Sequence, residues 1–412
     1  MNVDFMHALD RWAGIPLTCL LTAARRIRCL FGKQAPVPPR RLLFIKLSGI
    51  GASILADPAM NKAREKLAAE LFFVIFRKNR ASLDLLGTIR PSHVFTIREG
   101  NLFALALDTV RFLFWSRRHK IDTVIDLELF SRFTSLLSGL CGAKNRVGFS
   151  RFRSEGLYRG ELLTHRVAYN PYIHIAKNFV AQVNSLLASE DELPYSKQVV
   201  TDAEVKLPLM SYHETELVNM HEMVRRHYPR YERGRHRLVL INPCNGKALP
   251  QRRWPPERFI RLMQRILAAD PEVLVLITGA PAEHDETAFI RSEVGSDRCL
   301  NFAGSLQLAQ LPVLFTIAAL MVACDSGANH FSAITNLPTF ILYGPETPRL
   351  YGSLGNSTPI FAGLACSPCV SAANHRRTVC RDNKCLQAIS VDQVFAAIRP
   401  ILQSGWEERQ VR

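Results

Sequence analysis

The chain has 412 residues, of which 48% are hydrophobic and 21% are charged. This length exceeds what one ordinary hydrophobic core supports, so two globular domains are expected. The formal net charge of +16 is compatible with nucleic acid, anionic lipid or an acidic ligand as a partner. Nucleic acid is not expected, because the basic residues are not gathered in a tail and no RNA-binding aromatic signature, zinc finger or basic coiled coil occurs.

An amphipathic helix is predicted over residues 5–32. Its apolar side chains recur at helical spacing: Phe5, Leu9, Trp12, Cys19, Leu20, Ala23, Ile27, Leu30 and Phe31. Pro16 should kink or split this helix. The uncharged window between Arg11 and Arg25 has 13 residues, which is too short to cross a bilayer. Acidic residues precede the window, so it does not have the layout of a signal peptide.

Two placements of this helix remain open. Four basic side chains gather at its end: Arg25, Arg26, Arg28 and Lys33. They suit a helix in the plane of an anionic membrane surface, so residues 5–33 are predicted to contact lipid. The alternative is a helix that packs on the body of the protein. The following QAPVPP segment is predicted to be a stiff linker, and residues 1–39 form this first part of the chain.

The rest of the chain alternates short apolar runs with helical patterns. In residues 40–195 the predicted strands are Leu42–Leu47, Phe72–Phe76, Val94–Ile97 and Val124–Leu129. In residues 237–400 they are 238–242, 273–278, 318–324 and 339–343. Residues 196–236 are polar and are predicted to be a helical linker, and residues 401–412 a tail. The alternation predicts an α/β protein with two doubly wound parallel-sheet domains and a cleft between them.

The turns after these strands carry the candidate binding residues, because ligands of open α/β sheets bind at the carboxyl ends of the strands. The most informative turn is Asp325-Ser326-Gly327, which is followed by His330. An apolar run that ends in Asp-Ser-Gly predicts a tight turn and a helix start, where exposed N–H groups favour phosphate. The alternative is a plain corner in which Asp325 or Ser326 caps the helix.

Six short motifs occur in a specific order along the chain. They are Gly49-Ile50-Gly51, Arg252-Arg253-Trp254-Pro255-Pro256, Gly279-Ala280-Pro281, Ala303-Gly304-Ser305-Leu306, Asp325-Ser326-Gly327 with His330, and Tyr343-Gly344-Pro345. Each is weak alone, but together they resemble glycosyltransferase family 9, the lipopolysaccharide heptosyltransferases, over roughly residues 40–400. The resemblance implies the GT-B architecture, in which two Rossmann-like domains face each other. The C-terminal domain then binds a nucleotide sugar and the N-terminal domain binds the acceptor.

The resemblance also implies the donor-binding residues. They are the turn Asn242 to Lys247, Gly279, Gly304, Asp325, Ser326, Gly327 and His330. Arg252 stands where the family has a lysine; its guanidinium keeps the charge and adds bidentate phosphate geometry. A solvated helix start is the alternative for Arg252. Glu283, after the Gly-Ala-Pro turn, is implied to hold the nucleoside, and Ser326 replaces a family threonine while keeping the hydroxyl.

The first-domain turn, Gly49 to Gly51, departs from the family pattern at Ala52. The family has an aspartate there, the proposed general base, whereas alanine cannot take a proton. The best relocated candidate is Glu128, near the end of a predicted strand, and Asp57 is a weaker one. Glu128 has an alternative role as an ion-pair partner of Arg132. The departure also leaves open catalysis without a base, or a protein that only binds.

Four of the ten cysteines lie close together in the sequence: Cys366, Cys369, Cys380 and Cys385. A CxxC pair followed by two further cysteines predicts a structural zinc site with four thiolate ligands. Free thiols or a disulfide are the alternatives, and the absence of a secretory signal disfavours the disulfide. The loop residues Asn374, His375, Arg376 and Arg377 would then either reach a phosphate group or be solvated.

Taken with the resemblance, the sequence predicts an inverting glycosyltransferase that uses no catalytic metal. Its donor would be a nucleotide-diphosphate sugar, ADP-heptose or similar, and its acceptor a lipopolysaccharide or other lipid-linked surface glycan. It would be cytoplasmic and peripheral, at the inner face of the bacterial inner membrane. The alternative is a degenerate GT-B scaffold that binds a nucleotide sugar or glycan and recruits other assembly enzymes; Ala52 favours that alternative.

Overall fold

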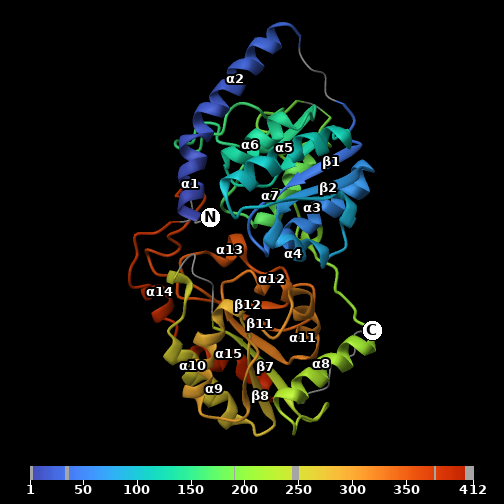
Figure 1. The fold of residues 1–412 in the computed structure, drawn as a ribbon. Helices are drawn as coiled ribbons and strands as arrows, with labels where there is room; N and C mark the ends of the chain where they lie inside the picture. Colours follow the sequence, from blue (N-terminus) through green and yellow to red (C-terminus); the bar gives the residue numbers. More distant parts are fainter. Residues whose placement is uncertain (1–2, 33–36, 190, 244–249, 375–376, 404–412) are drawn as a thin grey trace. The chain divides into compact units, whose positions relative to one another are not determined.

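A computed structural model describes the protein over residues 3–32, 37–189, 191–243, 250–374 and 377–403. The chain forms two compact units, Met1–Lys206 and Leu207–Arg412. Each unit is built around a six-stranded parallel sheet with flanking helices (Figure 1). The α/β class with two doubly wound sheets is therefore confirmed. The boundary between the units lies inside the predicted linker, residues 196–236.

The first sheet has the strand order β3-β2-β1-β4-β5-β6. Its strands are β1 Arg41–Ile45, β2 Glu70–Phe76, β3 Val94–Ile97, β4 Thr123–Asp126, β5 Asn145–Ser150 and β6 His165–Ala168. The helices of this unit after its first two are α3 Ala52–Leu67, α4 Arg80–Asp84, α5 Leu102–Arg118, α6 Arg132–Leu140 and α7 Ile175–Asn184. β5 and β6 were not among the predicted strands, because β6 buries a single residue fully and β5 begins and ends with polar residues.

The first sheet is buried on both faces. One face packs against α5 and α6 through an apolar cluster that includes Leu43, Ile45, Phe72, Val74, Phe112 and Leu137. The alternate residues Leu42 and Phe44 of β1 point to the other face and are also fully buried. On that face α3 and α7 pack against each other and contact the strands. Burial on both faces explains why β1 reads as an unbroken apolar run.

The second sheet has the order β12-β11-β10-β7-β8-β9. Its strands are β7 Arg237–Asn242, β8 Val273–Ile277, β9 Cys299–Asn301, β10 Leu320–Cys324, β11 Thr339–Tyr343 and β12 Ser357–Phe361. The helices are α8 Glu214–His227, α9 Pro256–Ala269, α10 His284–Val294, α11 Leu311–Ile317, α12 Asn329–Ser332, α13 Pro348–Tyr351, α14 Lys384–Gln387 and α15 Val391–Gln403. Trp254, from the Trp-Pro-Pro motif, is buried in the core with α9 and α15.

The N-terminal segment forms two helices, α1 Val3–Trp12 and α2 Gly14–Leu30, which run along α6 (Figure 1). The break between them falls at Ala13, three residues before Pro16, so the predicted split is confirmed. Asp10 of α1 accepts hydrogen bonds from the first N–H groups of α6, at 2.9 Å from Arg132 and 2.8 Å from Phe133. The α1–α2 segment is therefore docked on the first unit through a helix cap.

The α2 helix turns its polar side toward the protein. Its buried residues are Gly14, Thr18 and Thr22, and the Thr22 hydroxyl accepts the N–H of Glu161 at 3.0 Å. Its exposed side carries large apolar residues: Leu17, Leu20, Ile27 and Leu30. Trp12, at the end of α1, is 79% exposed. Among the described helices, none is both long enough and apolar enough to cross a membrane.

Candidate functional site

The switch point of the second sheet lies between β10 and β7, where the strand order reverses. Ala323 of β10 pairs with Asn242 of β7, so the turns that follow these two strands begin side by side. Ligands of open α/β sheets bind at this position, beyond the carboxyl ends of the strands. The predicted motif that begins at Asp325 directly follows β10.

The turn after β10 offers unengaged hydrogen-bond donors. The Asp325 N–H donates to the Leu342 carbonyl at 3.1 Å, whereas the N–H groups of residues 326–328 meet no acceptor among the described residues. The Ser326 hydroxyl is also buried without a partner within that part of the chain. The Ser326 and Gly327 carbonyls accept from the first two residues of α12, Asn329 and His330. Successive free N–H groups beside a hydroxyl favour a bound anion.

Arg252 brings positive charge to this turn. It ends the short 3-10 helix η4, Pro250–Arg252. Its Nη2 lies 2.6 Å from Oε1 of Glu346, and its Nε lies 3.5 Å from Oδ2 of Asp325. The guanidinium is only 17% exposed, and low exposure strengthens charge interactions because water screens them less. The structure thus gathers Arg252, Asp325 and Ser326, which the sequence predicted separately.

Glu346 is a residue of this site that the sequence-based prediction missed. It follows β11 after the Gly344-Pro345 pair, and its side chain is 1% exposed. A carboxylate with so little exposure is stable only when it is paired, here with Arg252. Its position after a strand, at the same sheet edge as Asp325, was a signal that could have identified it.

Gly279, Glu283 and Gly304 form a second tight arrangement, after β8 and β9. The Glu283 carboxylate accepts the N–H of Ala280 at 2.7 Å, and the N–H of Gly304 donates to the carbonyl of Gly279 at 3.0 Å. Gly304 has φ +76, and a Cβ there would lie 3.0 Å from Cα of Pro281. Glycine is therefore required at this position by both conformation and space. These contacts hold the turn, and the predicted role of Glu283 toward a nucleoside stays a prediction.

Asn242 is the last residue of β7, and its amide donates to the Thr278 hydroxyl at 3.2 Å. This bond ties the end of β7 to the end of β8, beside the turn after β10. Residues 244–247 of the predicted turn lie outside the described residues. His375 and Arg376 of the predicted cysteine loop also lie outside them.

In the first unit, the Glu128 carboxylate binds the chain that leaves β1. Oε1 accepts the N–H groups of Leu47 and Ser48, each at 2.8 Å, and Oε2 lies 2.8 Å from Nζ of Lys46. Burial alone would raise the pKa of Glu128, but the Lys46 ammonium and the Ser48 donors outweigh burial and hold that pKa below its usual value. Glu128 is therefore ionised at neutral pH and positions the first-domain turn. To act as a base it must release one of these donors.

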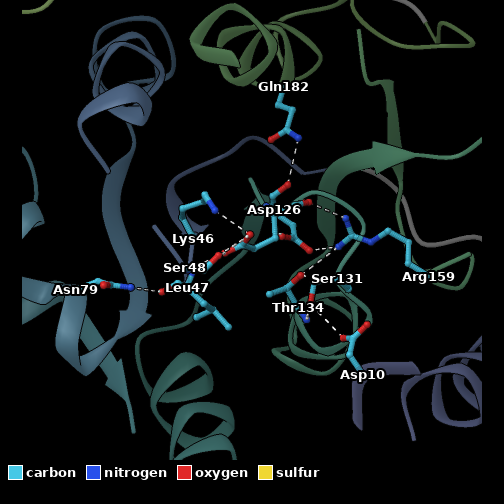
Figure 2. Close-up of polar contacts among 11 residues, drawn as sticks. Asp10, Lys46, Leu47, Ser48, Asn79, Asp126, Ser131, Thr134, Arg159 and Gln182 are labelled. Carbon is cyan, nitrogen blue, oxygen red and sulfur yellow. Dashed lines mark hydrogen bonds and ion pairs between the residues drawn. The ribbon is translucent and has the colours of Figure 1, made fainter. Parts of the chain in front are cut away.

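A buried ion pair lies behind Glu128. Arg159 Nη2 contacts Oδ2 of Asp126, and Arg159 Nη1 donates to the Glu128 carbonyl at 3.2 Å. Figure 2 shows Lys46, Ser48, Asp126 and Arg159 around the ends of β1 and β4. Burial raises the pKa of Asp126, and Arg159 counteracts this only in part. Asp126 and Arg159 are fully enclosed, so they support the site rather than face a ligand.

The predicted first-domain turn starts α3. Gly49 has φ +87, and its carbonyl accepts the N–H of Ala52 at 3.0 Å. The N–H groups of residues 49–51 meet no acceptor in the described part of the chain. The weaker candidate base, Asp57, is fully buried and accepts hydrogen bonds from Asn61 and Thr88. These contacts tie Asp57 to α3 and to the segment before β3, and its role as a base stays a prediction.

The predicted zinc site is not formed. Within the described residues, no group of three or more histidine, cysteine, aspartate or glutamate side chains is arranged to hold a metal ion. Cys366 is exposed and Cys385 is buried. The thiols between them have other partners: Cys369 lies 3.2 Å from the Thr378 hydroxyl, and Cys380 lies 3.6 Å from the Asp382 carboxylate. Cys369 and Cys380 thus have polar partners close in the sequence, and the described thiols do not gather as a metal site.

Residues 116–379 match the model of glycosyltransferase family 9, heptosyltransferase. The chain is also similar to lipopolysaccharide heptosyltransferase 2 of Escherichia coli, with 30% identity over 113 residues, or 26% of this chain and 32% of that protein. Lipopolysaccharide heptosyltransferase 1 of Pseudomonas aeruginosa is 26% identical over 127 residues, or 31% of this chain and 35% of that protein. The matched segments thus span about a third of each curated relative.

Solved structures resemble the chain over most of its length. The E. coli ADP-heptose lipopolysaccharide heptosyltransferase II has a TM-score of 0.66 at 16% identity, covering 88% of this chain and 98% of that one. The family 9 glycosyltransferase from Veillonella parvula has a TM-score of 0.64 at 18% identity, covering 90% and 99%. The E. coli heptosyltransferase WaaC, solved with ADP, has a TM-score of 0.62 at 14% identity, covering 88% and 99%. At such low sequence identity, these similarities show a shared fold only.

Proposed function

The chain belongs to glycosyltransferase family 9, and from that premise we propose that it transfers a sugar from a nucleotide-diphosphate donor. The donor is ADP-heptose or a similar sugar, and the acceptor is a hydroxyl group of lipopolysaccharide or another cell-surface glycan. Curated relatives that are lipopolysaccharide heptosyltransferases, and a structural neighbour solved with ADP, support this choice of donor. The transfer proceeds with inversion at the anomeric carbon.

One observation carries the proposal: Arg252 lies against the turn of free N–H groups after β10, at the switch point of the second sheet. A diphosphate seated on that turn would accept hydrogen bonds from residues 326–328 and from the Ser326 hydroxyl. The guanidinium of Arg252 would exchange its carboxylate partners for phosphate oxygens. These donors favour an anion more than a neutral ligand, so they suit the charge of a nucleoside diphosphate.

The same donors serve the chemical step. The acceptor oxygen forms a bond to the anomeric carbon while the bond from that carbon to the diphosphate breaks. The leaving diphosphate gains negative charge, and Arg252 and the N–H groups are fixed where this charge develops. They supply the positive charge that a departing diphosphate requires, so we propose no catalytic metal.

The acceptor proton needs a base in the first unit, because Ala52 cannot take it. Glu128 is the proposed base. It is ionised, it lies beyond β4, and its side chain keeps 12% exposure. Oε2 exchanges its Lys46 contact for the acceptor hydroxyl in this mechanism. The Leu47 and Ser48 N–H groups keep Oε1 in place meanwhile.

A panel of nucleotides tests the donor site. Thermal shift of the full chain is measured with ADP, UDP and GDP, and then with the sugar form of the base that binds. We expect ADP to raise the melting temperature more than the other two. If no nucleoside diphosphate stabilises the chain, the proposed donor site is contradicted. If only UDP or GDP stabilises it, the donor site stands but the donor carries that base in place of adenine.

We also propose that the chain acts at the inner face of the bacterial inner membrane, held there by α1 and α2. The support is their orientation: Thr18 and Thr22 face the protein, while Trp12, Leu20 and Leu30 face outward. An exposed apolar helix face suits the interface of a bilayer, while Arg25 and Arg26 at its end bond to Glu161 of the protein. Contact with the membrane and packing on the body of the protein are compatible for this segment, because it packs on the first unit by one face and leaves the other face uncovered.

A scaffold protein that binds a nucleotide sugar without transfer is the second candidate. The observation in its favour is that Ala52 stands at the start of α3 while the Glu128 carboxylate is occupied by four protein groups, the Lys46 ammonium, the Leu47 and Ser48 N–H groups and the Ser48 hydroxyl. Release of nucleoside diphosphate from ADP-heptose, measured with a lipopolysaccharide acceptor extract, separates the two functions. Donor binding without any acceptor-dependent release would support the scaffold.

A further inference from the structure

Two helices of the first unit, α2 and α5, expose apolar faces. On α2 the exposed residues include Leu20 and Leu30, as described above. On α5 the side chains of Phe103, Val110 and Phe114 are 80%, 50% and 71% exposed. These three positions fall on a single stripe of the helix, because they are separated by seven and four residues. An ordinary protein surface carries single, scattered apolar residues. A stripe with two exposed aromatic side chains therefore indicates a contact surface.

The helices that carry the two exposed stripes pack on the same neighbour. Helix α6 contacts both α2 and α5. Helices α5 and α6 also share the apolar cluster on one face of the sheet, through Phe112 and Leu137. Helices α2 and α5 are thus both neighbours of α6, and each leaves an apolar stripe exposed. We name these two stripes the α2–α5 face.

A hollow of about 490 Å³ lies at the end of α5. It is lined by four basic side chains and one carboxylate: Arg40, Arg117, Lys120, Lys144 and Asp122. Val37 and Pro38, from the segment that joins α2 to β1, complete part of its wall. The hollow is at the amino ends of β1, β4 and β5, the edge of the sheet opposite to the first-domain turn, Gly49 to Gly51. It is therefore separate from the site described above.

The hollow keeps an excess of positive charge. The Asp122 carboxylate is bound to the N–H groups of Arg40 and Arg41, with the latter at 2.9 Å. Arg117 donates to two carbonyls, Leu113 at 2.9 Å and Leu140 at 2.8 Å, which fixes its position without neutralising it. In the described part of the chain, the side chains of Lys120 and Lys144 form no ion pair, and both are exposed. Four cations against one carboxylate favour an anionic ligand.

We propose that the hollow binds the phosphate group of an anionic lipid headgroup in the bilayer on which the α2–α5 face docks. Phe114 precedes Arg117 by three residues, so the apolar stripe ends where the basic hollow begins, as an interface between acyl chains and headgroups requires. The volume of the hollow lies within the range of small-ligand sites, about 300–1,000 Å³. It is larger than the volume that a phosphate ion alone would fill. This inference rests on the proposed membrane association and names the lipid chemistry that it recognises.

Co-sedimentation of the full chain with vesicles tests the inference. The vesicles are phosphatidylcholine alone and phosphatidylcholine with phosphatidylglycerol. The variant is Lys120→Asn with Lys144→Gln; asparagine suits Lys120 because φ is +52 there. The control, Lys66→Gln with Lys197→Gln, removes the same charge from exposed positions outside the α2–α5 face. We expect the hollow variant to bind the anionic vesicles at least about tenfold more weakly, since each lysine near such a surface contributes roughly a factor of five. The control should change binding less than about threefold.

Equal binding by the hollow variant and the control would overturn the inference. A second variant, Phe103→Ser with Phe114→Ser, separates the two parts of the surface: it should weaken binding to both kinds of vesicle. If inorganic phosphate raises the melting temperature of the wild type but not of the hollow variant while vesicle binding is equal, the hollow is a site for a soluble phosphate and the lipid assignment is overturned. Stabilisation by ADP should be the same in all variants. Failure of the vesicle experiment with ADP binding intact would thus leave the transferase proposal standing.

Discussion

Arg252 is the residue on which the donor site depends most. In the free protein its guanidinium is held by Glu346 and Asp325, two carboxylates with very low exposure. Burying an ion pair costs desolvation free energy that its attraction often does not exceed. We therefore interpret the two carboxylates as partners that Arg252 exchanges for a ligand, and not as a source of stability. A diphosphate would compete with Glu346 for the same nitrogen atoms.

Arg252→Met should weaken ADP binding by roughly 10- to 100-fold, because hydrogen bonds to charged groups contribute about 1.5–3 kcal/mol each. Arg252→Lys should keep most of the affinity, since it retains the charge and loses the bidentate geometry. Isothermal titration measures both variants. Arg265→Met is the matched control, because this arginine of α9 lies at the surface against Asp392 and Phe395. Equal affinity in Arg252→Met and the control would remove Arg252 from the site.

Glu128→Ala should reduce the turnover number by about two to four powers of ten, the usual contribution of a positioned general base. The affinity for ADP should change less than about threefold, since the donor residues lie in the other unit. Melting temperature must be recorded with turnover, because loss of the bonds to Leu47 and Ser48 would also loosen the turn. Unchanged turnover would end the assignment of Glu128 as base. If Glu128→Ala lowered turnover but Glu128→Gln had the turnover of the wild type, Glu128 would be a positioning residue instead.

Helix α5 is an element whose attachment matters for the α2–α5 face. Asp108 anchors it to the end of β3 through Arg98, with Oδ2 at 2.8 Å from the arginine Nε and 2.9 Å from its N–H. The hydrogen bond from the Arg98 side chain is the main reason why the pKa of Asp108 is lowered to about 2. Asp108 is 7% exposed, whereas Arg98 is 39% exposed. The anchor thus depends on an ionised carboxylate that is partly shielded from water.

Because the folded protein lowers the pKa of Asp108, this pair stabilises the protein above about pH 4 and ceases to do so as pH falls toward 2. Asp108→Asn should lower the free energy of unfolding by roughly 1 kcal/mol at pH 7, less than the full shift because Arg98 is screened by solvent. In urea unfolding, the difference in free energy of unfolding between Asp108→Asn and the wild type should be smaller at pH 3 than at pH 7. Asp84→Asn, which breaks an exposed pair with Arg80, should change stability by less than about 0.5 kcal/mol at either pH. A difference for Asp108→Asn that does not depend on pH would exclude the ion pair as its cause.

At the scale of the whole molecule, the two units hold different parts of the chemistry. All the proposed donor residues that the structure describes belong to the unit Leu207–Arg412, and the turn bound by Glu128 belongs to Met1–Lys206. The α2–α5 face and its basic hollow also belong to the first unit. In the two proposals, positive charge acts at Arg252 on a diphosphate and at the hollow on a lipid phosphate.

A fragment of residues 207–412 should fold and bind ADP within about threefold of the full chain, because sites with no shared partners behave additively. It should release no nucleoside diphosphate in the presence of acceptor, since Glu128 and the first-domain turn are missing. Circular dichroism checks folding, and isothermal titration checks binding. A folded fragment that does not bind ADP would show that the donor site needs residues of the first unit.

Much of the fold was predictable from sequence because buried parallel strands are unbroken apolar runs bounded by turn residues. The predicted strands Val94–Ile97 and 339–343 match β3 and β11 residue for residue. The edge strand β6 was not predictable, because it buries only Val167 fully and its sequence carries no apolar run. Hydrogen bonding to a neighbouring strand defines such an element, and that neighbour is distant in the sequence.

The sequence by itself determined the two-sheet α/β class, the turn at Asp325 and the absence of the usual aspartate at Ala52. Tertiary structure decided which charged groups meet. It brought Glu346 to Arg252 from 94 residues away, attached Glu128 to the turn after β1, and kept the four cysteines from forming a metal site. It also turned Thr18 and Thr22 of α2 inward and left the apolar side of that helix outside. Local patterns record propensity and periodicity, whereas ion pairs and the direction of a helix face depend on which distant segments pack together.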